Sequence, residues 1–297
     1  MSDMAAESQH PHPAENDRGA SLLEALVSIL IIGVVFGGLV TQYSSSVAAS
    51  YDHSLRIAAQ VQAQAVLQTV INELRVLGNG VPFDQANFQI GENTLTDPTV
   101  TEPIDIAATT ATHIAFRLNE TGAVHLLTAD FNPVSSLTVH LTETTGIEVG
   151  SEIYLNNSVV GGDDGLYATV QEVNAAAKTA VLNADYVTTV GAVFDTGTIL
   201  EVVPIVSFDS PNDGSGITRD SGYGPVLLAE NSSMQLTYFS HDGTTLTPPL
   251  TNTDIVNSLR SILVQITVTS PKNLSTGVPY STTIEQRVGI RNLNYVF

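Results

Sequence analysis

The chain has 297 residues, enough for one or two domains with a sizeable hydrophobic core. It carries 30 Asp and Glu residues against only 10 Lys and Arg residues, a formal net charge of −20, which excludes nucleic-acid binding through a basic surface. It has no cysteine, which excludes disulfide bonds and thiolate metal sites.

Residues 1–19 are polar and rich in histidine, proline and acidic residues. From Ala20 the sequence is apolar for roughly 20 residues, the length that one helix needs to cross a bilayer core of about 30 Å. Glu24 lies near the start of this apolar run, although a carboxylate in hydrocarbon is costly and is usually kept for a function. The sequence therefore predicts a polar leader followed by a membrane-spanning helix that carries one functional acid.

This N-terminal pattern resembles the signature of type IV pilins and type II secretion pseudopilins. Gly19 stands before the bond that is cut in that family, Ala20 is the first mature residue and Glu24 the fifth. The resemblance implies cleavage of the Gly19–Ala20 bond by a prepilin peptidase, followed by N-methylation of Ala20. It also implies that Glu24 pairs with the terminal amine of a neighbouring subunit, because an unpaired charge in a lipid-like environment costs several kcal/mol. The alternative is a plain single-pass anchor that tolerates a glutamate near the interface.

The helical pattern continues beyond the membrane segment. Residues 41–77 contain neither proline nor glycine, and Gly78, Gly80 and Pro82 then mark the helix end. A helix that runs from Ala20 to Leu77 is about 85–90 Å long at a rise of 1.5 Å per residue. The apolar positions lie three to five residues apart, as expected for one face of a helix: Val47, Tyr51, Leu55, Ala58, Val61, Ala65, Val70, Leu74 and Leu77.

We therefore predict a cleaved leader at 1–19, a membrane or filament-core segment at 20–43, a projecting helical segment at 44–80 and a β-rich head at 81–297. The apolar stripe of the projecting segment should carry a sheet. An alternative is two helices with a break near Gly37-Gly38 or at residues 44–46.

After residue 82 the composition shifts to Thr, Val, Gly, Asn and Asp with short alternating apolar runs, which is typical of strands. The predicted fold class is α+β: a long N-terminal helix packed through its C-terminal half on an antiparallel sheet, with a β-rich insertion. We predict that the first two strands pair with each other, as do the fifth and sixth, and that the last three form one antiparallel set. The predicted strands are 112–118, 122–127, 136–142, 152–155, 166–173, 180–184, 199–208, 235–240, 261–270 and 280–291.

Three C-terminal stretches strengthen the resemblance. Residues 229–238, 259–268 and 285–292 are similar to the closing strands of PilW-type minor pilins and J-type pseudopilins. The resemblance implies a minor pilin of a type IV pilus that helps to initiate or cap the filament and supports adhesion, twitching or DNA uptake. The implied partners are other pilin or pseudopilin subunits, the prepilin peptidase/N-methyltransferase and the bacterial inner membrane, with the N-terminus cytoplasmic and the head periplasmic.

Two other functions remain open at this point. One is a J-type pseudopilin of a type II secretion system, which shares the processing, the helix and the terminal strands. The other is a membrane-tethered binding or sensor domain that never polymerises, which predicts no cleavage after Gly19.

The sequence offers little catalytic chemistry, and we expect no enzymatic activity. No two histidines have the i, i+4 spacing of a zincin helix, and no Gly-x-Ser-x-Gly motif occurs. The acidic loop after residue 208 is a candidate calcium site, because carboxylates and carbonyls supply the oxygens that calcium prefers. A second candidate is the loop at 161–165, although glycine with aspartate is also ordinary turn chemistry. The candidate calcium ligands of the preferred loop are Asp209, Asn212, Asp213 and Asp220.

Aromatic residues are expected in the core or on strand faces rather than in a ligand site. The residues concerned are Tyr223, Tyr238, Phe239 and Tyr295.

Overall fold

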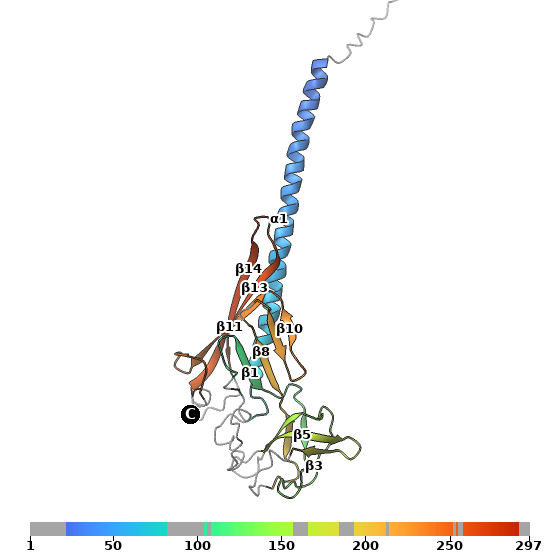
Figure 1. Ribbon diagram of the computed structural model, residues 1–297, viewed down its shortest axis with the longest axis vertical. Coiled ribbons are helices and arrows are strands. Elements are labelled where there is room, and N and C mark those ends of the chain that lie inside the picture. The colour runs from blue at the N-terminus through green and yellow to red at the C-terminus, as the bar shows by residue number, and fades with distance from the viewer. Residues whose placement is uncertain are drawn as a thin grey trace, which may run out of the picture. The chain divides into compact units, whose positions relative to one another are not determined.

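The computed structural model describes residues 22–81, 104–105, 108–156, 166–183, 193–211, 214–251, 254 and 258–290. The chain divides into two compact units, residues 1–53 and 54–297. Within the described residues, the first unit contains the N-terminal part of one helix, and the second contains the rest of that helix and all the strands (Figure 1).

A single helix, α1, runs over Leu22–Val76. It passes through Gly37-Gly38 and residues 44–46 as regular helix, so the break considered as an alternative is not formed. Beyond Val76 the chain turns at Gly78 and Gly80, which have φ values of 74° and 79°. Glycine adopts this left-handed conformation without the steric cost that a side chain brings, which is why it commonly follows a helix.

The C-terminal part of α1 buries one face. Its buried residues recur three or four positions apart, which is the spacing of one side of a helix. They share a core with residues from two antiparallel sheets, which confirms that the C-terminal part of the helix packs on a sheet. The predicted stripe is correct at Val70, Leu74 and Leu77 but wrong further up the helix, where Ala58, Val61 and Ala65 are exposed and the buried face is shifted by one or two positions. The buried positions on the helix are Ala59, Ala63, Val66, Leu67, Val70, Ile71 and Leu74.

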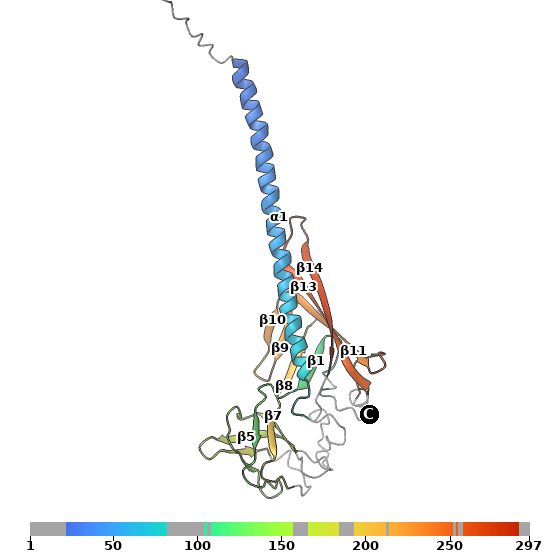
Figure 2. The same ribbon diagram turned by 180° about the vertical axis from the view of Figure 1, so that it is seen from behind.

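Two four-stranded antiparallel sheets flank this part of the helix (Figure 2). The first has the order β1-β8-β9-β10. The second has the order β12-β11-β13-β14 and contains the last three strands predicted from the sequence. The strands of the first are β1 His113–Arg117, β8 Ile205–Asp209, β9 Ile217–Asp220 and β10 Val226–Ala229. Those of the second are β11 Ser232–Ser240, β12 Thr245–Leu246, β13 Leu259–Asn273 and β14 Pro279–Gly289.

The β-rich insertion is a six-stranded sheet with the order β2-β7-β4-β5-β6-β3 and a hydrophobic core of its own. The predicted pairing of the fifth and sixth strands is confirmed as the β5–β6 hairpin. The strands are β2 Val124–Leu126, β3 Thr138–His140, β4 Glu152–Asn156, β5 Leu166–Asn174, β6 Thr179–Leu182 and β7 Ile199–Val202.

Two strand predictions are wrong, and both errors arise where the chain changes sheets. The first two predicted strands do not pair with each other, because β1 pairs with β8 while β2 pairs with β7. The predicted strand at 199–208 is two strands, β7 and β8, which lie in different sheets. Pro204 lies between them, and proline cannot donate the backbone hydrogen bond that a continuous strand requires there. The acidic loop expected after residue 208 also contains a strand, β9.

Candidate functional site

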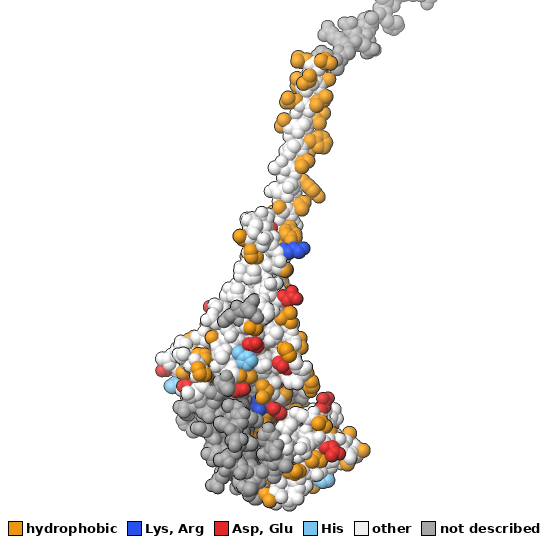
Figure 3. All heavy atoms as spheres, in the orientation of Figure 1, with side chains coloured by type: hydrophobic (Ala, Val, Ile, Leu, Met, Phe, Trp, Pro, Cys, Tyr) orange, Lys and Arg blue, Asp and Glu red, His pale blue; other side chains and the backbone are white. Residues whose placement is uncertain are grey.

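The N-terminal part of α1 presents apolar side chains on every side. Within the described residues, 22–47 are all exposed, including Leu22 at 84% and Ile29 at 70% of their full accessible surface. Figure 3 shows these hydrophobic side chains along the helix. By its length and composition the helix is able to cross a membrane, and none of the apolar stretch is buried within the protein. Apolar exposure on this scale indicates a surface that lipid or other protein helices cover.

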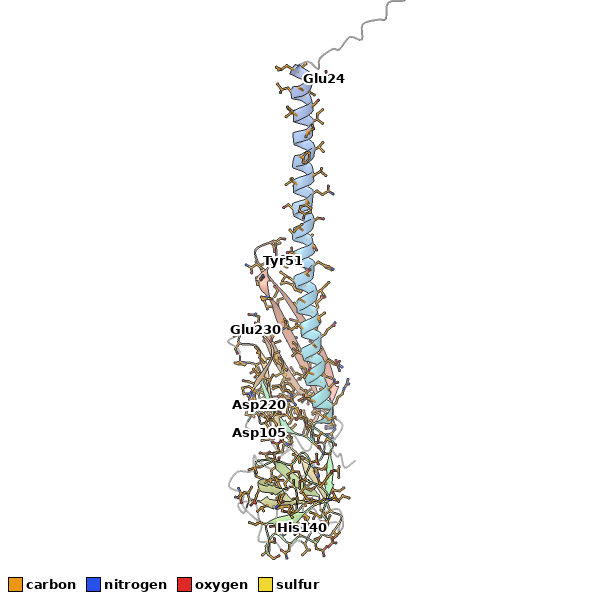
Figure 4. All side chains as sticks on the ribbon, turned by 90° about the vertical axis from the view of Figure 1, so that its right-hand side faces the viewer. Glu24, Tyr51, Asp105, His140, Asp220 and Glu230 are labelled. Carbon is orange, nitrogen blue, oxygen red and sulfur yellow. The ribbon has the colours of Figure 1, made fainter. Side chains whose placement is uncertain are left out.

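Glu24 is in the first turn of α1, at the N-terminal end of the exposed segment (Figure 4). A negative charge at this place is favoured by the helix dipole, whose positive end lies at the N-terminus. Its backbone carbonyl accepts a hydrogen bond from the Ser28 hydroxyl at 2.8 Å. The other two residues of the predicted processing and assembly site, Gly19 and Ala20, lie outside the described residues.

Three glycines leave the exposed helix surface open. A Cβ atom added at Gly33, Gly37 or Gly38 would have no other heavy atom within 4 Å, apart from its chain neighbours and the nearby helix backbone. Small residues of this kind allow two helices to approach closely in lipid. The helix surface around them is therefore suited to packing against another helix.

A buried polar cluster joins the β1–β8 sheet to the insertion. Arg117 on β1 is 1% exposed, and its guanidinium contacts the Glu152 carboxylate on β4. The same guanidinium lies 4.4 Å from the centre of the Tyr167 ring, and the Tyr167 hydroxyl donates to Glu152 Oε2 at 2.8 Å. Burial raises the pKa of Glu152 to about 7, because it removes water from around the charged carboxylate.

The turn that follows α1 meets this cluster. The backbone N–H of Gly78 donates to the Arg117 carbonyl at 2.8 Å, and that of Asn119 donates to the Asn79 carbonyl at 2.8 Å. The Asn119 side chain also donates to Glu201 Oε1 on β7 at 3.0 Å. The end of the helix, the end of β1 and the insertion are thus held by one set of polar contacts.

Sequence reasoning missed this polar junction. Arg117 is a charged residue at the end of an apolar strand in a chain with few cations, which is a weak signal of a buried ion pair. Its partner Glu152 lies 35 residues away, on a strand of another sheet. No local pattern in the sequence connects the two residues.

The two candidate calcium ligands that the structure describes, Asp209 and Asp220, have other partners. Asp209 lies 3.2 Å from Nδ1 of His113, and Asp220 Oδ1 accepts the backbone N–H groups of Gly222 and Gly224 at 2.8 and 3.0 Å. Asn212 and Asp213, like the loop at 161–165, lie outside the described residues. Within the part of the chain that the structure describes, no three His, Asp or Glu side chains are grouped to hold a metal ion. The calcium site stays a prediction from the sequence.

The aromatic residues have different environments. Tyr238 is fully buried and donates its hydroxyl to the Thr110 carbonyl at 2.9 Å, which confirms the prediction that it lies in the core. Phe239 lies on a strand face with the Arg287 guanidinium 4.1 Å from the centre of its ring. For Tyr223 the prediction is wrong, because this residue is in a turn and is 84% exposed. Tyr295 lies outside the described residues.

Comparisons of the chain with models of known protein families and with curated proteins find no match.

Proposed function

We propose that the chain is a subunit of a type IV pilin-like filament, most like a minor pilin of a type IV pilus. In this proposal a prepilin peptidase removes residues 1–19 at the inner membrane of a bacterium. The helix then anchors the subunit, with the head on the periplasmic side, until the subunit enters the filament. There it helps to initiate or cap assembly.

The observation that carries the proposal is that α1 has two parts with different surfaces. Its C-terminal part buries one stripe in the head, whereas its N-terminal part exposes apolar side chains on all sides. Such a helix needs a lipid environment before assembly and neighbouring helices after it. Glu24 at the N-terminal end of α1 gives each subunit one acid with which to set its register against a neighbour.

Mass spectrometry of the mature N-terminus tests the proposal directly. We expect an N-methylated Ala20 as the first residue of the protein purified from cell membranes. A Gly19→Leu variant should keep the leader, because the peptidase needs a small residue before the cut. A native protein that begins at Met1 or Ser2 would favour a membrane-tethered domain that does not polymerise.

A J-type pseudopilin of a type II secretion system is the alternative within the same superfamily, because the stretches at 229–238, 259–268 and 285–292, which overlap β11, β13 and β14, resemble both kinds of subunit. The two functions differ in where the processed protein is found. A minor pilin should appear in filaments sheared from the cell surface. A pseudopilin should remain in the cell envelope, and its deletion should stop the secretion of a folded exoprotein.

A further inference from the structure

A pocket of about 490 Å³ lies where the insertion meets the β1–β8 sheet. Its lining comes from β4 and β7 of the insertion, from the start of β8, from the loops after β1 and before β4, and from the β9–β10 turn. Pockets that hold small molecules in proteins typically measure 300–1,000 Å³. This pocket is therefore large enough for a small ligand.

The β9–β10 turn presents an aromatic ring to this pocket. Asp220 Oδ1 accepts the N–H groups of Gly222 and Gly224, so the turn that carries Tyr223 is held on both sides of that residue. Tyr223 lines the pocket and is 84% exposed. Among the described residues its ring makes no contact with another ring or a cation. An exposed ring on a fixed turn offers a flat apolar face with a hydroxyl at its end.

Hydrogen-bonding side chains also line the pocket, and two of its three glutamates have an arginine partner. Glu120 accepts a hydrogen bond from Arg219 Nη2 at 2.6 Å, and Glu152 is paired with Arg117. Because each carboxylate has two oxygens with about four acceptor positions, both still have acceptors to offer a ligand. Ser151 accepts the Glu148 N–H at 2.9 Å through its hydroxyl oxygen, which leaves the hydroxyl proton able to donate.

The charges of the lining indicate the class of ligand. None of the described lining residues is a lysine or arginine, and the chain has a net charge of −20, so an anionic ligand would be repelled. Two of the three lining glutamates already have an arginine partner, which weakens the attraction for a cation. A neutral ligand with an apolar face and several hydroxyls fits both constraints.

We propose that this pocket binds a neutral sugar unit, with Tyr223 stacked on the C–H face of the sugar ring. The carboxylates of Glu120 and Glu152 accept hydrogen bonds from sugar hydroxyls, and Ser151 donates to a sugar oxygen. This role is independent of filament assembly and would give the head a surface for recognising glycans.

Saturation-transfer NMR on the full-length protein in nanodiscs tests the proposal, with free glucose, galactose, N-acetylglucosamine and mannose as probes. We expect at least one of these sugars to receive saturation from the protein. Tyr223→Ala should weaken that binding about tenfold, because the stacking surface is lost. The matched control is Tyr51→Ala, which removes a tyrosine on α1 and should leave binding unchanged.

A second variant distinguishes sugar binding from the binding of a basic side chain. Glu148→Gln keeps the size of the side chain and removes the remaining glutamate charge that has no ion pair in the described structure. Neutral-sugar binding should change less than about twofold in this variant. The proposal is overturned if no probe binds, if Tyr223→Ala binds normally, or if arginine methyl ester binds where the sugars do not.

Discussion

Arg219 on β9 donates its Nε–H to Glu73 Oε1 on α1 at 2.7 Å, and its Nη2 contacts Glu120 at 2.6 Å. One guanidinium therefore bridges the helix and the loop after β1. Burial raises the pKa of Glu73, and Arg219 opposes that rise by stabilising the charged carboxylate. The ion pair contributes to holding the C-terminal part of the helix on the sheet.

Removing the cation should destabilise the head. In Arg219→Ala, Glu73 is left largely buried without its partner, and we expect unfolding to become easier by about 1–3 kcal/mol, since the pair is only partly shielded from water. Adding Glu73→Gln should recover part of this loss, because a neutral amide costs less to bury. Urea unfolding of the four proteins of this double-mutant cycle measures the coupling, and additive effects would show that the pair does not interact.

The stability of the junction should depend on pH through Glu152. Its pKa in the folded protein is about 7, above that of an exposed glutamate, so the folded state holds a proton that the unfolded state releases. Stability should be greatest below the unfolded pKa of about 4.5 and should fall as the pH rises through about 7. The change ends about one pH unit above the folded pKa, where Glu152 is ionised in both states.

Glu152→Gln should flatten that dependence, because an amide does not titrate. The measurement is the unfolding midpoint of both proteins between pH 5 and 8. The control is Glu172→Gln, which removes a carboxylate from an exposed position on β5. Parallel pH profiles for the native protein and Glu152→Gln would show that Glu152 is not the group that makes stability depend on pH.

Gly216 should not tolerate a side chain. It has φ of +109°, and a Cβ added there would lie 2.2 Å from the Ala229 carbonyl oxygen on β10. We expect Gly216→Ala to lower stability by about 2–4 kcal/mol by separating β9 from β10. Gly289→Ala is the matched control, since a Cβ at that strand position meets no atom within 4 Å. Equal unfolding midpoints for the two variants would show that the close approach at Gly216 is absent in solution.

Glu24→Ala tests the assembly role separately from folding and from membrane insertion. The variant should still insert, because its apolar segment becomes more hydrophobic. It should be lost from the filament fraction, since the terminal amine of a neighbour would have no carboxylate to pair with. Immunoblots of membrane and sheared fractions compare it with Ser28→Ala, one turn further along the helix. Normal incorporation of Glu24→Ala would rule out the pairing.

The local patterns of the sequence predict the parts of the fold that local physics determines. The spacing of Val70 and Leu74 places them on one face of a long helix, and both are fully buried there. The same spacing is wrong for Val61, which is exposed, because apolar residues occur on more than one side of this helix. The sequence cannot show which sheet a strand joins, because pairing depends on residues far along the chain. The alternation of apolar residues alone predicts a single strand at 199–208. Only Pro204 indicates that this stretch is two strands, which lie in different sheets.

Some residues of the candidate sites have a local signal in the sequence, and others are brought together only by contacts between distant parts of the chain. Glu24 is visible in the sequence because an acid in an apolar run is locally anomalous. Asp220 is a candidate calcium ligand in the sequence because it is an acid close to glycines. In the structure its carboxylate accepts hydrogen bonds that order the turn carrying Tyr223. Arg117 and Glu152 have no local signal, since what relates them is a contact between two sheets.

The chain leaves the β1–β8 sheet at Arg117 and returns to it at Ile205, and these two residues are direct partners in the antiparallel ladder. The whole insertion is therefore spliced into what would otherwise be a simple hairpin. Because the insertion begins and ends at paired residues, a change in its length does not alter the register between β1 and β8. A shortened chain with a tight turn in its place would keep the two sheets that pack on the helix and would lose the pocket, so the pocket and the helix scaffold are separable in the sequence.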